Sequence, residues 1–177
     1  MSAPAPPLKG KEQASYVTRL GSLDDYEKGG VEIVNDDPRH YAFSNVFEVA
    51  RHARPYEKIA VGKNMEYVLE AIRADGVSEW RTAAHDEFAL VMDGEVEISL
   101  VRLDESPLPA DAVGAVALDG EPVGRRMGRV VARRGHMTLL PGGAAYRFSS
   151  PRPSVILMQT MAGPGTQYRW AEIAQSL

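Results

Sequence analysis

His85 and Glu87 are two residues whose types and spacing could carry out chemistry. Residues i and i+2 of a β-strand lie on the same side of it, roughly 6 to 7 Å apart, so both side chains could reach one shared ligand. A carboxylate also orients a neighbouring imidazole and raises its basicity, as general acid–base catalysis requires. The same pair is common as a plain structural contact, and the residues alone leave both interpretations open.

The segment that must position this pair, HDEFALVMDGEVEISL at 85–100, is predicted to be two strands joined by a tight turn. Asp93 and Gly94 are residue types that tolerate a positive φ, and they separate two apolar-rich runs, which predicts a β-hairpin. In 95–100 apolar and polar residues alternate, as in a strand with one buried face. In 87–92 both alternating sets are largely apolar, so we expect that strand to be covered on both sides.

The rest of the chain adds short, closely spaced strands with turn signals between them, the pattern of an antiparallel sandwich or barrel. The predicted elements are strand structure in 56–76, a hairpin excursion over 104–130, a strand, turn and strand in 135–150, a last core strand at 155–161 and a short helix at 168–173 that packs through Trp170. We therefore predict an all-β fold that ends in a short C-terminal helix.

The first 45 residues are expected to form a mobile tail and an extended arm before a domain that covers 46–177. Residues 1–15 are rich in Pro, Ala and Lys and offer little to pack, and one short strand is expected at 31–34. The segment YAFSNVFEV at 41–49 is more apolar than a surface loop, which suggests a strand or a contact surface. The arm either folds on its own domain or lies on a partner chain.

Length and composition exclude several classes of function. The 177 residues suffice for one domain with a sizeable core. Asp and Glu outnumber Lys and Arg by 24 to 20, which disfavours nucleic-acid binding. The absence of cysteine excludes disulfides, zinc–thiolate sites and a thiol nucleophile. The sequence contains neither a signal-peptide core at its start nor a run of about 18 apolar residues, so we expect a cytoplasmic protein without a membrane partner.

An arginine cluster is the one strongly charged feature of the sequence. Its members, within ten residues, are Arg125, Arg126, Arg129, Arg133 and Arg134. Charge clusters of this kind are usually solvated faces, and the alternative is a surface that binds an acidic partner.

The chain resembles the cupin family of small antiparallel jelly rolls at the positions of that family's two motifs. The matching residues are Gly76, Glu87 and Gly94 in the first motif and Gly135, Pro141 and Gly143 in the second. In the first motif the family's two histidine places fall on Arg81 and Ala83, or on Trp80 and Thr82 if the spacer is one residue longer. In the second motif Tyr146 and Ser150 take the places of the third histidine and the asparagine. Only Glu87 matches a metal ligand. One carboxylate cannot hold a catalytic transition metal, which needs about three protein ligands, so the resemblance implies a jelly-roll barrel with a degenerate metal site.

A narrower resemblance covers most of the chain from about residue 16 onward. The segments YAFSNVFEVA, YEKIAVGKNMEYVLEAIRADG, AAHDEFALVMDGEVEI and RWAEI are similar to the small (alpha) subunit of the two-subunit hydroquinone 1,2-dioxygenases. This resemblance implies an Fe(II)-dependent enzyme that uses O₂ to open hydroquinone to 4-hydroxymuconic semialdehyde. It also implies that the iron lies in a larger cupin subunit, assembled with this one as an α2β2 heterotetramer.

Two other functions stay open at this point. The chain could be a self-contained isomerase or lyase in which His85, Glu87 and Tyr146 supply an acid, a base and a phenol. It could also be a non-catalytic module that binds a phenol in an apolar cavity. Trp80 and Arg81 are candidates for the wall of a substrate pocket or for a partner contact, because an aromatic ring beside a permanent cation suits both roles. Their alternative is a packed tryptophan beside a solvated arginine.

Overall fold

The computed structural model of the chain describes residues 21–26, 45–109, 111–169 and 172–173. The expected tail, most of the arm, the strand at 31–34 and Trp170 lie outside these residues. The elements are α1 (Val46–His52), β1 (Lys58–Asn64), β2 (Tyr67–Val77), β3 (Arg81–Thr82), β4 (Glu87–Asp93), β5 (Glu95–Leu103), β6 (Val116–Ala117), β7 (Gly124–Arg133), β8 (Met137–Leu140), β9 (Ala144–Met161) and β10 (Thr166–Gln167). No helix among the described residues is long and apolar enough to cross a membrane.

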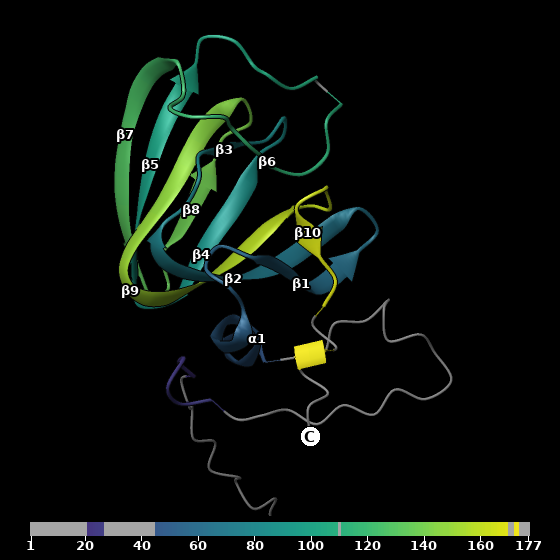
Figure 1. Cartoon of the computed structure of the whole chain (residues 1–177), viewed down its shortest axis with the longest axis vertical. Coiled ribbons are helices and arrows are strands. Elements are labelled where there is room, and N and C mark those ends of the chain that lie inside the picture. Colours follow the sequence, from purple (N-terminus) through teal and green to yellow (C-terminus); the bar gives the residue numbers. More distant parts are fainter. Residues whose placement is uncertain (1–20, 27–44, 110, 170–171, 174–177) are drawn as a thin grey trace, which may run out of the picture.

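The ten strands form one sheet that curls into a half-barrel, which confirms the predicted all-β, cupin-like fold (Figure 1). β9 is the longest strand and joins the two layers. Its first half pairs antiparallel with β5, and its second half pairs with β2 on one side and β4 on the other. Between these halves Ala74 pairs with Ser154 and Gly76 with Ser150, so residues 151–153 bulge from the ladder. Prolines at 151 and 153 suit such a bulge because they cannot donate to the ladder.

The interior of the half-barrel is apolar along most of its length. Residues at alternate positions of each strand face it, as the period of a strand requires. The largest of the fully buried apolar side chains in this cluster are Tyr146, Ile98, Leu140, Ile156 and Met158. The predicted inward residues of the strand at 95–100 are confirmed in part, since Val96 and Ile98 are fully buried while Leu100 is half-buried at the edge.

The segment 85–100 does not form the predicted hairpin. Gly94 turns the chain with φ of +78°, as its residue type suggests. However, β4 pairs with β8 and β9, whereas β5 pairs with β7 and β9. The two strands therefore run into opposite layers of the half-barrel. The turn chemistry was predicted correctly, but the sequence of a turn does not show whether the flanking strands pair with each other or with a third strand.

The one complete helix among the described residues, α1, lies near the N-terminus rather than at the C-terminus, which corrects our prediction. α1 falls in the segment we expected to be a strand or a contact surface. The Asn45 side chain accepts a hydrogen bond from the backbone N–H of Phe47 at 3.0 Å and caps the helix. Val49 packs on Ile59 and Ala71, so α1 covers part of the outer face of the sheet. Of the predicted C-terminal helix, only Glu172 and Ile173 are described as helical.

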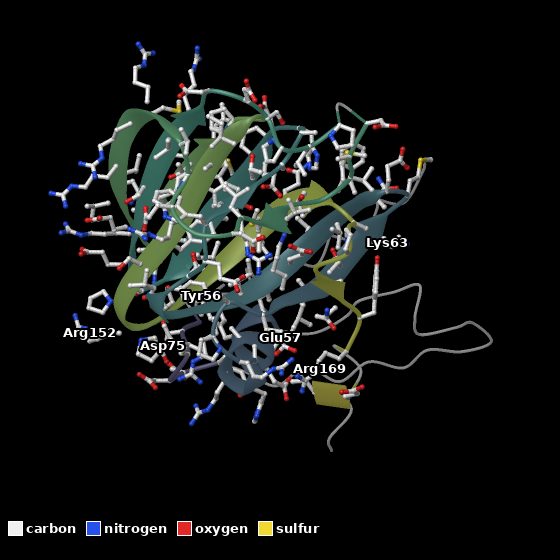
Figure 2. All side chains as sticks on the ribbon, turned by 45° about the horizontal axis from the view of Figure 1, so that its top comes forward. Tyr56, Glu57, Lys63, Asp75, Arg152 and Arg169 are labelled. Carbon is white, nitrogen blue, oxygen red and sulfur yellow. The ribbon has the colours of Figure 1, made fainter. Side chains whose placement is uncertain are left out.

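The C-terminal segment is tied to the start of β1 by an ion pair (Figure 2). Arg169 Nη1 lies 3.0 Å from Glu57 Oε1, and the Glu57 side chain is almost buried. The predicted excursion after β5 is confirmed: β5 and β7 pair antiparallel from Glu95–Arg133 to Leu103–Gly124.

We expect Gly94→Ala to lower the free energy of unfolding by about 2 to 4 kcal/mol, measured by urea denaturation. The alanine would have to adopt an unfavourable positive φ, and its Cβ would also overlap the Ser154 side chain. Gly120→Ala is the matched control, because Gly120 has a similar φ of +80° with no atom within 4 Å of the new Cβ. The control should cost only about 1 kcal/mol. Equal losses in the two variants would contradict the role of the Ser154 contact.

Candidate functional site

Glu87 lies inside the half-barrel. It is the first residue of β4, and its side chain is fully buried together with Ala89 and Val91 on the same face. The opposite face of β4 carries Phe88, which is 39% exposed. Our prediction that both faces of this strand are covered is therefore wrong within the described part of the chain.

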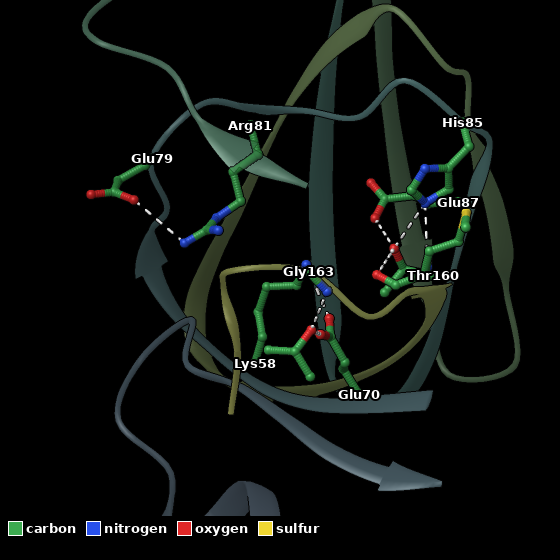
Figure 3. Close-up of polar contacts among 10 residues, drawn as sticks. Lys58, Glu70, Glu79, Arg81, His85, Glu87, Thr160 and Gly163 are labelled. Carbon is green, nitrogen blue, oxygen red and sulfur yellow. Dashed lines mark hydrogen bonds and ion pairs between the residues drawn. The ribbon is translucent and has the colours of Figure 1, made fainter. Parts of the chain in front are cut away.

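The structure brings His85 and Glu87 together through a third residue, Thr160 of β9 (Figure 3). The Thr160 hydroxyl donates to Glu87 Oε1 at 2.5 Å and lies 3.2 Å from His85 Nε2. The backbone N–H of Met161 donates to the same nitrogen at 3.3 Å, which places the ring proton of a neutral His85 on Nδ1. The hydroxyl therefore lies between the imidazole and the carboxylate, and its one proton is donated to Glu87, while the unprotonated Nε2 of His85 accepts from Met161.

Sequence reasoning missed Thr160. The ladder pairs Phe88 with Gln159 and Ala89 with Met158, and continuing this register puts Thr160 opposite Glu87. The only signal in the sequence is a polar residue at an inward position of a strand that is otherwise apolar, and its meaning depends on knowing which strands pair.

Tyr146 faces the same interior from the first half of β9 and is 2% exposed. Its ring packs against Phe148 with the centroids 5.3 Å apart, and its hydroxyl lies near the Glu87 carboxylate but forms no hydrogen bond of standard geometry with the described residues. Burial, reinforced by the negative charge of Glu87, raises the pKa of the Tyr146 phenol well above its ordinary value. Tyr146 is therefore a neutral phenol at any physiological pH.

A second polar pair, which the sequence did not predict, lies across the interior. Lys58 Nζ is 3.0 Å from Glu70 Oε2, and these side chains are 4% and 0% exposed. The Thr166 hydroxyl donates to Glu70 Oε1 at 2.7 Å. Neither Lys58 nor Glu70 stands out in the sequence, because their strands contain other charged residues, Lys63 in β1 and Arg73 and Asp75 in β2.

Trp80 and Arg81 lie on different sides of the sheet. The Trp80 indole donates to Glu121 Oε2 at 2.9 Å and stacks under the Arg147 guanidinium, 4.5 Å from its ring centroid. It packs with Val101 on the outer side, beneath the excursion. Arg81 instead lines an enclosed cavity beside Tyr146. The structure thus brings Arg81 to the interior group of candidate residues and separates Trp80 from it.

The cavity beside Tyr146 and Arg81 has no room for an aromatic substrate. The enclosed cavity next to Tyr146 measures about 10 Å³, enough for about one water molecule, whereas ligand pockets typically measure about 300 to 1,000 Å³. The residues that line it are Tyr56, Lys58, Ile72, Ser78, Arg81, Tyr146, Phe148 and Met158. His85, Glu87 and Tyr146 therefore meet in a packed interior and not in a pocket.

The same residues do not suit a catalytic iron ion. Among the described residues no three side chains of the types His, Cys, Asp and Glu cluster as a metal site would require. Glu87 accepts from Thr160 and His85 accepts from the Met161 N–H, and two ligands fall short of the about three that fix a transition metal. Arg81, which stands at one of the histidine places of the cupin motif, adds a positive charge to the interior and so opposes a cation.

Two solved structures are similar to this chain over nearly its whole length. One is the hydroquinone 1,2-dioxygenase PnpCD in complex with Cd²⁺ and 4-hydroxybenzonitrile, with 51% identity over 92% of this chain and 98% of that chain and a TM-score of 0.81. The other is the hydroquinone 1,2-dioxygenase from Sphingomonas sp. TTNP3 with 4-hydroxybenzoate bound. It has 56% identity over 90% of this chain and 97% of that chain, with a TM-score of 0.82. The chain belongs to the hydroquinone 1,2-dioxygenase family.

The same family contains a second, longer chain. A chain of PnpCD in complex with Fe³⁺ is similar to our chain at 11% identity and a TM-score of 0.58. The match covers 93% of our chain but only 45% of the PnpCD chain. The two PnpCD matches therefore involve chains of different length, and this chain corresponds to the shorter one. At 11% identity the match to the longer chain shows a shared fold only. A scan against protein-family models and a search of curated proteins found no match.

We expect Tyr146→Phe to change the free energy of unfolding at pH 7 by less than about 1 kcal/mol, because the lost hydroxyl has no partner. The folded pKa of Tyr146 is raised, so the stability it contributes is fully present below its unfolded pKa of about 10 and is lost as pH rises beyond it. The variant should therefore lose stability less steeply above pH 10 in urea denaturation. A loss of more than about 2 kcal/mol at pH 7 would show that the hydroxyl has a structural bond.

Proposed function

We propose that this chain is the small, non-metal-binding subunit of an Fe(II)-dependent hydroquinone 1,2-dioxygenase. The assembled enzyme would use O₂ to open hydroquinone to 4-hydroxymuconic semialdehyde in the degradation of aromatic compounds. The observation that carries the proposal is identity of 51% and 56% to the shorter chains of two such enzymes, over 98% and 97% of those chains. We further propose a cytoplasmic α2β2 heterotetramer in which the larger cupin subunit holds the iron.

The ligands bound to the relatives support the class of substrate. 4-Hydroxybenzonitrile and 4-hydroxybenzoate, present in the two solved structures, are phenols with a substituent opposite the hydroxyl, as hydroquinone is. PnpCD was solved with Fe³⁺ and with Cd²⁺, which supports a metal in the assembled enzyme. The closed interior of this chain supports the longer chain as the place where metal and substrate meet.

The interior charges support a role as a scaffold. Lys58 pairs with Glu70 inside the barrel at 3.0 Å. Arg81 also lines the interior and pairs with Glu79 at 3.4 Å, while Glu87 accepts a hydrogen bond from Thr160. Buried charges are costly unless they are paired and hydrogen-bonded, and a metal ion would ordinarily supply the positive charge of a cupin interior. A barrel that supplies this charge itself can keep its shape without a metal and present a constant surface to a partner.

The first test is reconstitution. The purified chain with ferrous iron and hydroquinone should consume no O₂ and should form no ring-cleavage product. Adding the larger subunit under the same conditions should start both. Oxygen uptake and product absorbance measure the outcome, and full activity of this chain by itself would contradict the proposal.

A second test concerns Glu87, the one residue that matches a cupin ligand. In the assembled enzyme Glu87→Gln should leave the iron content per heterotetramer and kcat within about twofold of the wild type, because the isosteric amide can still accept from Thr160. Iron content is measured on the purified complex. Loss of half or all of the iron would show that this subunit carries a metal site after all.

A further inference from the structure

β7 is an exposed edge strand. It spans ten residues and pairs only with β5 among the described strands, and it forms the outermost strand on the left of Figure 1. Every residue of β7 except Ala132 is exposed. The backbone groups on the side away from β5 thus have no strand to pair with in the described part of the chain. Soluble proteins usually shorten, twist or cover such an edge, because it is a template for pairing with another chain.

The side chains of β7 are apolar in one half. Met127, Val130 and Val131 are 43%, 39% and 48% exposed. Val130 faces the same side of the sheet as the buried Ala132, and Val131 faces the other side. A strand added to this edge would contact side chains on both faces and would satisfy the free backbone groups at the same time.

The arginines of β7 divide into two groups. Arg129 pairs with Glu97 at 3.0 Å and Arg133 with Glu95 at 2.6 Å, both across the ladder to β5. Arg125 and Arg126, at the other end, have no ion-pair partner among the described residues.

Arg126 also lines a groove of about 550 Å³ between β7 and the end of the excursion. The other cation near Trp80, Arg147, is paired with Glu121 at 3.0 Å, so Arg126 is the groove's cation without such a partner in the described part of the chain.

We propose that the free edge of β7 is a docking site for an extended, acidic segment of the larger subunit. The segment would add a strand beside β7, with apolar residues against Met127, Val130 and Val131 and with carboxylates beside Arg125 and Arg126. This inference rests on the proposed function, because it takes the larger subunit as the partner. The sequence left open whether the arginine cluster is a solvated face or a surface that binds an acidic partner, and this proposal takes the second interpretation.

Charge disfavours a second copy of this chain as the occupant. β7 contains four arginines and no carboxylate. Pairing two copies edge to edge would add four more arginines without a single counter-charge from the strand, and like charges brought together at an interface cost affinity. An acidic strand meets the unpaired cations instead.

The test uses the full chain and the larger subunit of the same enzyme. The dissociation constant of the complex is measured for the wild type and for Arg125→Glu/Arg126→Glu, which should bind at least about tenfold more weakly and should lose part of the salt dependence. The matched control is Lys63→Glu/Arg152→Glu, which changes the net charge equally at two positions outside β7 (Figure 2). The control should stay within about twofold of the wild type.

Hydrogen exchange of the wild-type chain supplies a second readout. The backbone amides of 125–131 that point away from β5 should exchange quickly in the free chain and slowly in the complex, because a docked strand protects them, whereas those bonded to β5 are protected in both states. If the Arg125/Arg126 variant binds like the wild type and these amides still exchange quickly in an active complex, the docking site is wrong while the proposed function stands.

Two other outcomes would also overturn the proposal. Failure of the wild-type chain to form any active complex with the larger subunit would overturn the proposed function along with it. Slow exchange at 125–131 that depends on the concentration of this chain alone would identify a second copy as the occupant.

Discussion

The pairing of one long strand, β9, with strands of both layers is the constraint on which the rest of this fold depends. Its first half binds β5 and its second half binds β2 and β4, so the half-barrel closes only if both halves keep their register. A slip of one residue would turn every inward side chain outward. The bulge at 151–153 does not change which alternate residues of β9 point inward. Tyr146 and Thr160 therefore face the same interior from opposite ends of the strand.

That interior explains why a cupin-like chain has a place in a metalloenzyme family without holding the metal. The ion pair of Lys58 with Glu70 joins the neighbouring strands β1 and β2 inside the barrel, and Thr160 donates to one oxygen of Glu87. Both contacts are buried, and both occupy space that a substrate would need. Arg81, at one of the histidine places of the cupin motif, lines the cavity beside Tyr146 and pairs with the exposed Glu79. The retained carboxylate is thus part of a packed polar core, and its match to the cupin motif reflects shared backbone geometry.

The sequence predicted the strands, the Gly94 turn and the inward alternation of β5, because these follow from local residue types and from a period of two. It did not predict that β4 and β5 separate into different layers, since pairing partners are set by β9, some 60 residues away. Thr160 was missed for the same reason, whereas the Lys58–Glu70 pair joins neighbouring strands and was missed because other charged residues surround it in both. The helix at Val46–His52 falls in a segment that was expected to be a strand or a contact surface, because its apolar residues are as consistent with one period as with the other over so short a segment.

The polar interior also bears on how this chain folds. A protein whose metal site is part of its core draws part of its folding free energy from the ion. Here the buried carboxylate Glu70 is paired with Lys58, a cation that is synthesised with the chain. Under the proposed function, in which the partner carries the iron, the folding of this subunit would not depend on the supply of the metal.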